Sequence, residues 1–259
     1  MFTMLGQCNA CIFPTGICRL YTFDFLFSSA GKILLYISVV VFAISYLAEL
    51  KMLSTTFILF CLSCVIISFH ESNGIYFRAT VLSAIWFVQF IAYAQKHFNP
   101  DFNSHQWRIQ YTVQIISAVY FLAAVAKLRI SGIGWVNAGP LFSLQVIKNF
   151  SLSFYNSGEV SVMERGWLIA NTLLHNKLIT KIFLSASLFL ELFCFLAAFN
   201  YRLKIIFGTG LLLMHVGIAL IMGIGVSVIA FPMTIFFINP LWIVYHLVER
   251  TKKSLPCFV

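Results

Sequence analysis

Seven apolar stretches, each about as long as a membrane is thick, dominate this chain. A helix of about 20 apolar residues can cross the hydrocarbon core because it satisfies its backbone hydrogen bonds internally. The pattern therefore predicts an all-α, polytopic integral membrane bundle of about seven transmembrane helices. The predicted spans lie near residues 30–48, 53–69, 77–95, 110–127, 178–199, 203–222 and 226–246.

The composition is that of a membrane protein. Of its 259 residues, 61% are hydrophobic and 10% are charged, whereas about a quarter of the residues in a soluble domain are charged. The net charge of +9 does not indicate a nucleic-acid partner, because lysines and arginines at span ends set orientation and contact lipid headgroups. We expect membrane lipid as a partner and no nucleic acid.

Basic residues in the short loops predict the orientation of the chain. Lys51, Lys96, Arg202 and the tail 250–253 fall on one side of a seven-span protein, and such residues favour the cytoplasmic side. The N-terminus is then outside and the C-terminus in the cytoplasm. The expected parts are an extracytoplasmic segment 1–29, a transmembrane domain 30–248 and a cytoplasmic basic tail 249–259.

The long connection 128–177 falls on the extracytoplasmic side in this arrangement. Its stretches 138–150 and 161–175 are apolar enough to form helices, and basic residues are common on helices that lie in a membrane interface. We therefore expect interfacial helices in this connection.

Two groups of cysteines suggest different chemistry. Cys8, Cys11 and Cys18 lie in segment 1–29, where an oxidising exterior favours a disulfide, although the spacing does not decide which two pair. Cys61 and Cys64 form a C-x-x-C motif inside the second predicted span. Such cysteines usually pack as small apolar residues, but they also suit a quinone-linked thiol-disulfide oxidoreductase.

Five polar side chains occur where a bilayer should exclude them: His70, Asn73, Lys127, Glu191 and His215. An ionised group in hydrocarbon costs about 2.5 kcal/mol or more, so each should face the bundle interior. Separately, Asn73 suits a helix N-cap, Lys127 a headgroup anchor, and Glu191 a structural pair with a cation. Together they indicate a functional site.

Other histidines do not show the spacing of a metal site. His97 and His105 share a polar loop, and His175 and His246 stand alone at predicted helix ends. None has the i, i+4 or C-x-x-C spacing that fixes ligands around zinc. We predict no metal.

Three motifs contain these polar residues. The first is Val119-Tyr-Phe-Leu-Ala-Ala-Val-Ala-Lys127-Leu, followed by Trp135-Val-Asn-Ala-Gly139. The second combines Leu190-Glu191-Leu with Leu213-Met-His215, and a weaker third is His70-Glu-Ser-Asn73-Gly-Ile-Tyr76. In residues and order the three motifs resemble the vitamin K-dependent γ-carboxylase family and its bacterial relatives with an HTTM domain.

The resemblance implies a catalytic role for Lys127, as the base that deprotonates a reduced, vitamin K-like quinone. Reaction of that quinone with oxygen then yields a stronger base, which deprotonates peptide glutamates so that they can add carbon dioxide. By the same resemblance Glu191 and His215 belong to the catalytic site. The substrate and cofactor pocket would contain His70, Asn73, Tyr120, Trp135 and Asn137.

Departures from the family leave the substrate open. Asn137 stands where the carboxylase has an acidic residue, and the large domain that presents the peptide has no counterpart, so we expect a separate partner protein for presentation. The size and the cysteine-bearing segment are similar to the bacterial sporulation-delaying protein B group, which helps to mature a secreted peptide toxin.

We therefore expect a bacterial plasma-membrane enzyme that modifies an exported peptide with a quinol cofactor. Two alternatives remain open: a thiol-disulfide oxidoreductase that uses Cys61 and Cys64, and a non-catalytic protein of toxin maturation or immunity.

Overall fold

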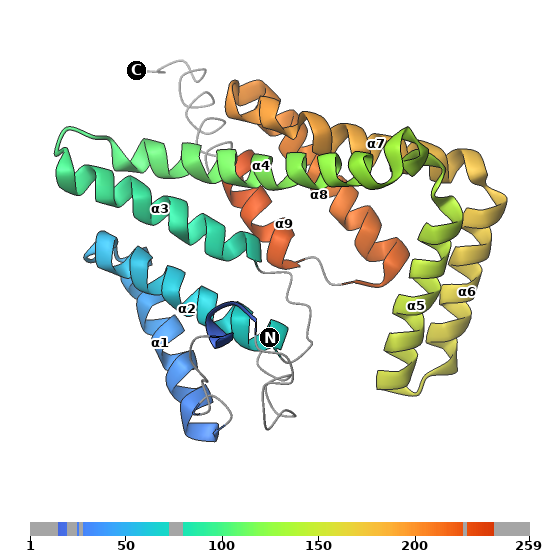
Figure 1. Cartoon of the computed structure of the whole chain (residues 1–259), viewed down its shortest axis with the longest axis horizontal. Coiled ribbons are helices and arrows are strands. Elements are labelled where there is room, and N and C mark those ends of the chain that lie inside the picture. Colours follow the sequence, from blue (N-terminus) through green and yellow to red (C-terminus); the bar gives the residue numbers. More distant parts are fainter. Residues whose placement is uncertain (1–14, 20–24, 26–27, 73–79, 225–226, 241–259) are drawn as a thin grey trace, which may run out of the picture. The chain divides into compact units, whose positions relative to one another are not determined.

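The computed structural model describes residues 15–19, 25, 28–72, 80–224 and 227–240 (Figure 1). Regular structure within these residues is entirely helical, which confirms the all-α class. The α-helices are α1 (Ser29–Leu47), α2 (Met52–Ser72), α3 (Thr80–Phe98), α4 (Ser104–Ser131), α5 (Gly139–Ser157), α6 (Val160–His175), α7 (Lys177–Phe193), α8 (Tyr201–Met222) and α9 (Ser227–Met233). Short helical segments are η2 (Gly16–Arg19), η4 (Gly132–Asn137), η5 (Cys194–Ala198) and the π-helical η6 (Thr234–Ile238).

Five helical stretches in the described residues are long and apolar enough to cross a membrane. These are Ser29–Leu47, Met52–Ser72, Ser104–Asn137, Lys177–Ala198 and Tyr201–Met222. They agree with five of the seven predicted spans and identify the chain as compatible with an integral membrane protein.

The other two predicted spans are not confirmed. Helix α3 has the length of a span, but Gln89, Gln95 and Lys96 lower its hydropathy, and residues 77–79 lie outside the described part. The last predicted span is described only as far as residue 240, where α9 and η6 form a short apolar stretch, Ile229–Ile238. The predicted orientation of the two termini likewise concerns residues that the structure does not describe.

The chain divides into two compact units, Met1–Ile116 and Ser117–Val259, here called the N-terminal and C-terminal units. In the N-terminal unit α2 packs against both α1 and α3. The side chain of Gln89 is almost fully buried there: its Oε1 accepts a hydrogen bond of 2.6 Å from the Tyr46 hydroxyl, and its Nε2 lies 3.4 Å from Thr112 Oγ1. A polar group buried in an apolar bundle needs such partners.

Cys18, one of the three candidates for the predicted disulfide, is a buried free thiol. It packs with Leu35, Ile66 and Phe69, because backbone N–H groups of Thr15 and Ile17 bond to serine hydroxyls near the end of α2. Burial among apolar side chains gives this thiol a packing role. The other two candidates, Cys8 and Cys11, lie outside the described residues.

In the C-terminal unit, α5 and α6 form an antiparallel hairpin that runs across the direction of α4 and α7 (Figure 1). Helix α4 ends before Gly132 (φ 58°), and α5 ends at Gly158 (φ 72°), a left-handed conformation that favours glycine. Both helices of the predicted connection are thus confirmed, and α5 extends seven residues beyond the predicted end at residue 150. Their position in the membrane interface stays a prediction.

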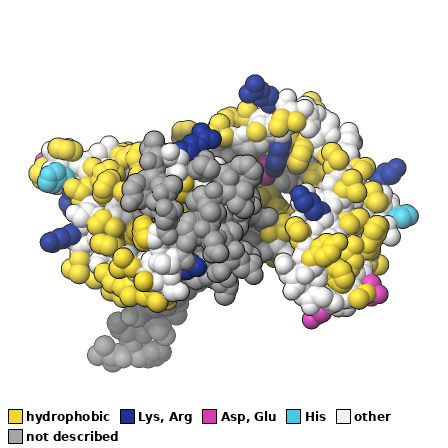
Figure 2. Space-filling model, turned by 60° about the horizontal axis from the view of Figure 1, so that its bottom comes forward, with side chains coloured by type: hydrophobic (Ala, Val, Ile, Leu, Met, Phe, Trp, Pro, Cys, Tyr) yellow, Lys and Arg dark blue, Asp and Glu magenta, His cyan; other side chains and the backbone are white. Residues whose placement is uncertain are grey.

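Large apolar side chains cover much of the surface in each unit, as Figure 2 shows for one face. Exposed examples include Ile33, Leu34 and Ile44 on α1 and Ile206, Leu213 and Leu220 on α8. In water, molecules with such a surface would aggregate through it, whereas lipid acyl chains solvate apolar side chains at little cost. The exposed faces therefore fit a bilayer.

The close approach of α5 and α6 generates a prediction about stability. A Cβ added to Gly166 would lie 2.4 Å from Phe150 Cβ, whereas one added to Gly134 would meet nothing within 4 Å. We expect Gly166→Ala to lower the free energy of unfolding by about 2 kcal/mol, because the helices must separate. Thermal unfolding in detergent micelles measures this, with Gly134→Ala as the control. Equal melting temperatures for the two variants would contradict the tight hairpin.

Candidate functional site

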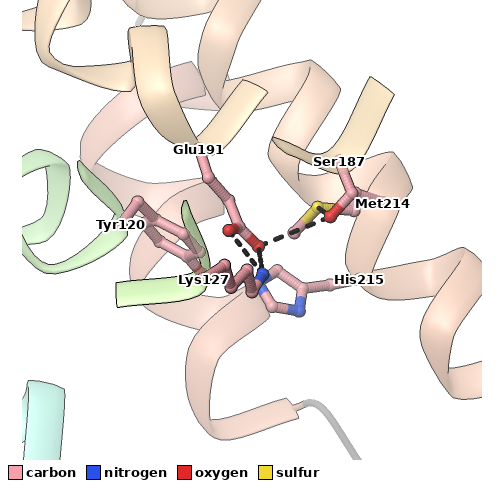
Figure 3. Close-up of polar contacts among 6 residues, drawn as sticks. All are labelled: Tyr120, Lys127, Ser187, Glu191, Met214 and His215. Carbon is pink, nitrogen blue, oxygen red and sulfur yellow. Dashed lines mark hydrogen bonds and ion pairs between the residues drawn. The ribbon is translucent and has the colours of Figure 1, made fainter. Parts of the chain in front are cut away.

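The C-terminal unit brings Lys127 and Glu191 into direct contact (Figure 3). Lys127 lies in the last turns of α4 and Glu191 near the end of α7. The ammonium nitrogen Nζ is 2.6 Å from Oε1 and 2.5 Å from Oε2 of the carboxylate. Only 7% of the Glu191 side chain and 25% of the Lys127 side chain are exposed. A buried carboxylate is tolerated because the cation lies against both of its oxygens.

Ser187 supports the carboxylate from one turn earlier on α7. Its hydroxyl lies 3.4 Å from Glu191 Oε1 and 3.1 Å from Met214 Sδ, so it can donate to either atom. The spacing of four residues puts Ser187 and Glu191 on the same face of the helix. Sequence analysis missed Ser187 and Met214, although the i, i+4 spacing from Glu191 could have identified the serine.

A second polar pair, Tyr120 and His215, is buried in the same unit (Figure 3). The Tyr120 hydroxyl is 2.5 Å from Nε2 of His215, and the tautomer of the imidazole decides which atom donates. The hydroxyl also lies 3.8 Å from Met233 Sδ. This pair joins α4 to α8.

One face of α4 contributes one residue to each pair, Tyr120 and Lys127. Ser117, Tyr120, Ala124 and Lys127 follow one another at spacings of three, four and three residues, which places them on one stripe of the helix. Ser117 is itself buried, with its hydroxyl 3.6 Å from Cys194 Sγ. The stripe turns its polar side chains toward α7 and α8 and leaves apolar residues such as Leu122 exposed.

A cavity of about 390 Å³ adjoins the Lys127–Glu191 pair. Its polar lining comes from Lys127, Ser187, Glu191 and Gln145, and the other lining residues are apolar or aromatic: Trp135, Ala138, Leu141, Phe142, Phe183, Leu184, Ile218 and Met222. An apolar cavity with a few convergent polar groups is the usual form of a small-molecule site.

Trp135 connects the ion pair to the cavity wall. The Lys127 ammonium lies 5.2 Å from the centroid of its ring, within the range of a cation–π interaction. The indole Nε1 is buried and has no hydrogen-bond partner among the described residues. A buried donor is normally satisfied, so this N–H is an exception beside the cavity.

The remaining predicted residues do not line this cavity. Tyr120 and His215 are buried beside Met233, because Tyr120 lies two helical turns before Lys127 on α4. Asn137 lines a separate cavity of the same unit. His70 is buried at the end of α2 in the N-terminal unit, and Asn73 lies outside the described residues.

The cysteines of the alternative redox site are free thiols. Cys61 and Cys64 lie half-buried on α2, at a spacing of three residues. Across the described ranges, no group of three histidine, cysteine or acidic side chains is placed to hold a metal ion.

Comparisons with protein-family models, curated proteins and solved structures give no match for this chain. Membership of the γ-carboxylase-like family therefore stays a prediction from the motifs. The chemistry of the site must be argued from its own residues.

The buried ion pair predicts an asymmetric effect of mutation. Lys127→Met should lower the free energy of unfolding by about 3 kcal/mol, because Glu191 would remain buried without its cation. The double variant Lys127→Met/Glu191→Met should recover most of this loss, since two apolar side chains then fill the space. Denaturant titration in micelles measures both. Single and double variants of equal stability would show that Lys127 and Glu191 do not form their ion pair in the folded protein.

Proposed function

We propose that this chain is a membrane-embedded, γ-carboxylase-like enzyme of the HTTM class, which matures an exported peptide with a reduced quinone as cofactor. The observation that carries the proposal is the Lys127–Glu191 pair at the wall of an apolar cavity. Such a cavity admits a lipid-soluble molecule, and the pair supplies the proton chemistry there. A soluble, charged substrate would gain little from these walls.

The residues present fit a quinol. A cavity of about 390 Å³ has room for a bicyclic aromatic ring, and Trp135, Phe142 and Phe183 offer aromatic walls. In this proposal the hydroxyl groups of such a ring bond to the ion pair, and the ring packs on Trp135, whose indole N–H has no other partner among the described residues. When bound, a reduced quinone would supply an acidic hydroxyl and the reducing equivalents for reaction with oxygen.

The contact between Lys127 and Glu191 allows the pair to act as a base. In the proposed step Lys127 takes up the proton of a hydroxyl in the cavity and passes one of its own protons to the Glu191 carboxylate, to which it is already hydrogen-bonded. Glu191 holds the amine in place throughout, and the nearby ammonium stabilises negative charge in the cavity.

Tyr120 and His215 act as positioning residues in this proposal. Their hydrogen bond fixes α4 against α8, and both helices contribute lining residues to the cavity. Lys127 lies on the same stripe of α4 as Tyr120, so loss of this hydrogen bond should displace the amine. A misplacement of about 1 Å can cost a hundredfold in rate.

The decisive test separates a base from a cation. We expect Lys127→Arg to abolish maturation of the exported peptide, because guanidinium keeps the positive charge and the pairing with Glu191 but stays protonated. Glu191→Gln should impair maturation severely. The measurement is incorporation of radiolabelled bicarbonate into peptides secreted by cells that express the chain with its genomic neighbours.

Three controls accompany this test. Lys127→Met/Glu191→Met should insert and fold but incorporate no label, whereas Cys61→Ala and Cys64→Ala should behave like the natural protein if these thiols only pack. Full incorporation by the Lys127→Arg protein would refute the role of Lys127 as the base. Loss of function in both cysteine variants at normal expression would favour the oxidoreductase instead.

Binding of the cofactor gives a test that does not need the peptide. Trp135→Phe keeps an aromatic wall but removes the indole donor, so menadiol should bind about fivefold more weakly. Methylnaphthalene has a similar shape without oxygen, and its affinity should change little. Anaerobic calorimetry on the purified protein in nanodiscs measures both ligands. An equal loss for the two ligands would mean that Trp135 acts by shape alone.

A further inference from the structure

A second cavity in the C-terminal unit has a different chemical character. It has a volume of about 280 Å³ and lies between the start of α5, the end of α6 and the first turns of α7. Its lining residues are Val136, Asn137, Gly139, Pro140, Leu173, Leu174, Lys177, Thr180 and Lys181. The segment 135–142 lines both cavities, since Trp135, Ala138, Leu141 and Phe142 belong to the first.

Two lysines with unneutralised charge line this second cavity. Lys177 and Lys181 are one turn apart on α7 and exposed, and neither forms an ion pair with a described residue. Like charges at this spacing repel each other on a helix. An anion in the cavity would relieve the repulsion by binding between the two ammonium groups.

Two polar side chains, Thr180 and Asn137, lie beside the lysines and have different roles. The hydroxyl of Thr180 lies 2.9 Å from the backbone oxygen of Leu173, to which it donates, so it joins α7 to α6 beneath the cavity. Asn137, expected from sequence to belong to the quinone pocket, lies here instead. Its exposed amide can donate to an anionic oxygen.

Apolar side chains that face outward surround the lysines. Leu174, Leu178, Ile179 and Ile182 are all exposed, and Leu178 reaches 70%. The stretch that begins at Lys177 is long and apolar enough to span a membrane. The cavity therefore lies at the end of a candidate span, where headgroups meet acyl chains.

We propose that this cavity binds the phosphate headgroup of an anionic lipid, with Lys177, Lys181 and Asn137 as its ligands. The acyl chains lie along the exposed face of α7 formed by Leu178 and Ile182. A lipid phosphate combines a negative charge, shared by two oxygens, with attached apolar chains, which matches the lysine pair and the apolar surface beside it. An acidic peptide would match the lysines but would not cover the leucine and isoleucine side chains.

The site is independent of the quinol chemistry proposed above. It shares segment 135–142 with the first cavity, so a bound lipid also restrains the helical segment η4, which contains Trp135. Binding of lipid can thus be measured on the resting protein, without cofactor or peptide.

Native mass spectrometry of the purified protein in micelles tests the proposal. Phosphatidylglycerol should bind more tightly than phosphatidylcholine, and the double variant Lys177→Gln/Lys181→Gln should bind phosphatidylglycerol at least about tenfold more weakly. The matched control is Lys148→Gln, which removes an exposed lysine of α5 that does not line the cavity. It should leave the affinity unchanged.

Each other outcome overturns the assignment. Equal affinity for the two lipids, or equal loss of affinity in the Lys148→Gln control, would show that Lys177 and Lys181 form no specific lipid site and act only through the net surface charge. Inorganic phosphate that binds as tightly as phosphatidylglycerol, with the same lysine dependence, would assign the cavity to a free anion. Displacement of the lipid by a polyglutamate peptide at lower concentration would assign it to the peptide.

Discussion

The contact between Lys127 and Glu191 is the interaction on which the site depends, because neither side chain belongs in a bilayer by itself. A lone carboxylate on α7 would cost several kcal/mol in hydrocarbon, and the lysine at the end of α4 could reach the headgroups instead. Their contact, at 2.5 to 2.6 Å, aligns the end of α4 with the end of α7. Trp135 then covers the ammonium from the following segment, η4. One electrostatic pair thus determines where the wall of the cavity lies.

The pattern around that pair is typical of a membrane bundle that builds a polar interior from single residues. Ser117, Tyr120 and Lys127 occupy one stripe of α4, and they meet Cys194, His215 and Glu191 from the neighbouring elements. Serine hydroxyls elsewhere donate back to their own helix, as Ser143 and Ser153 do on α5. Tyr120 and Lys127 instead have partners on neighbouring helices, because lipid offers none.

Segment 135–142 lies between two cavities whose lining residues differ in chemical character. One side meets the aromatic walls and the ion pair, and the other meets Lys177 and Lys181. Glycine at position 139 permits this close packing, since a Cβ there would lie 3.3 Å from Thr180 Cγ2. A headgroup bound on one side would therefore restrain the segment that shapes the other, which links the lipid surroundings to the geometry of the proposed reaction site.

The sequence by itself determined the helical class, five of the spans, the two helices of the 128–177 connection and the inward position of Glu191. These follow from hydropathy over about 20 residues and from the cost of charge in lipid, which are local properties. The tertiary structure alone decided that Lys127 pairs with Glu191, that Tyr120 and His215 form a separate buried pair, and that Asn137 faces a second cavity. It also showed Cys18 to be buried. Partners 64 and 95 residues apart in the chain meet only through the packing of helices, and no spacing along one helix encodes which neighbour its polar stripe will face.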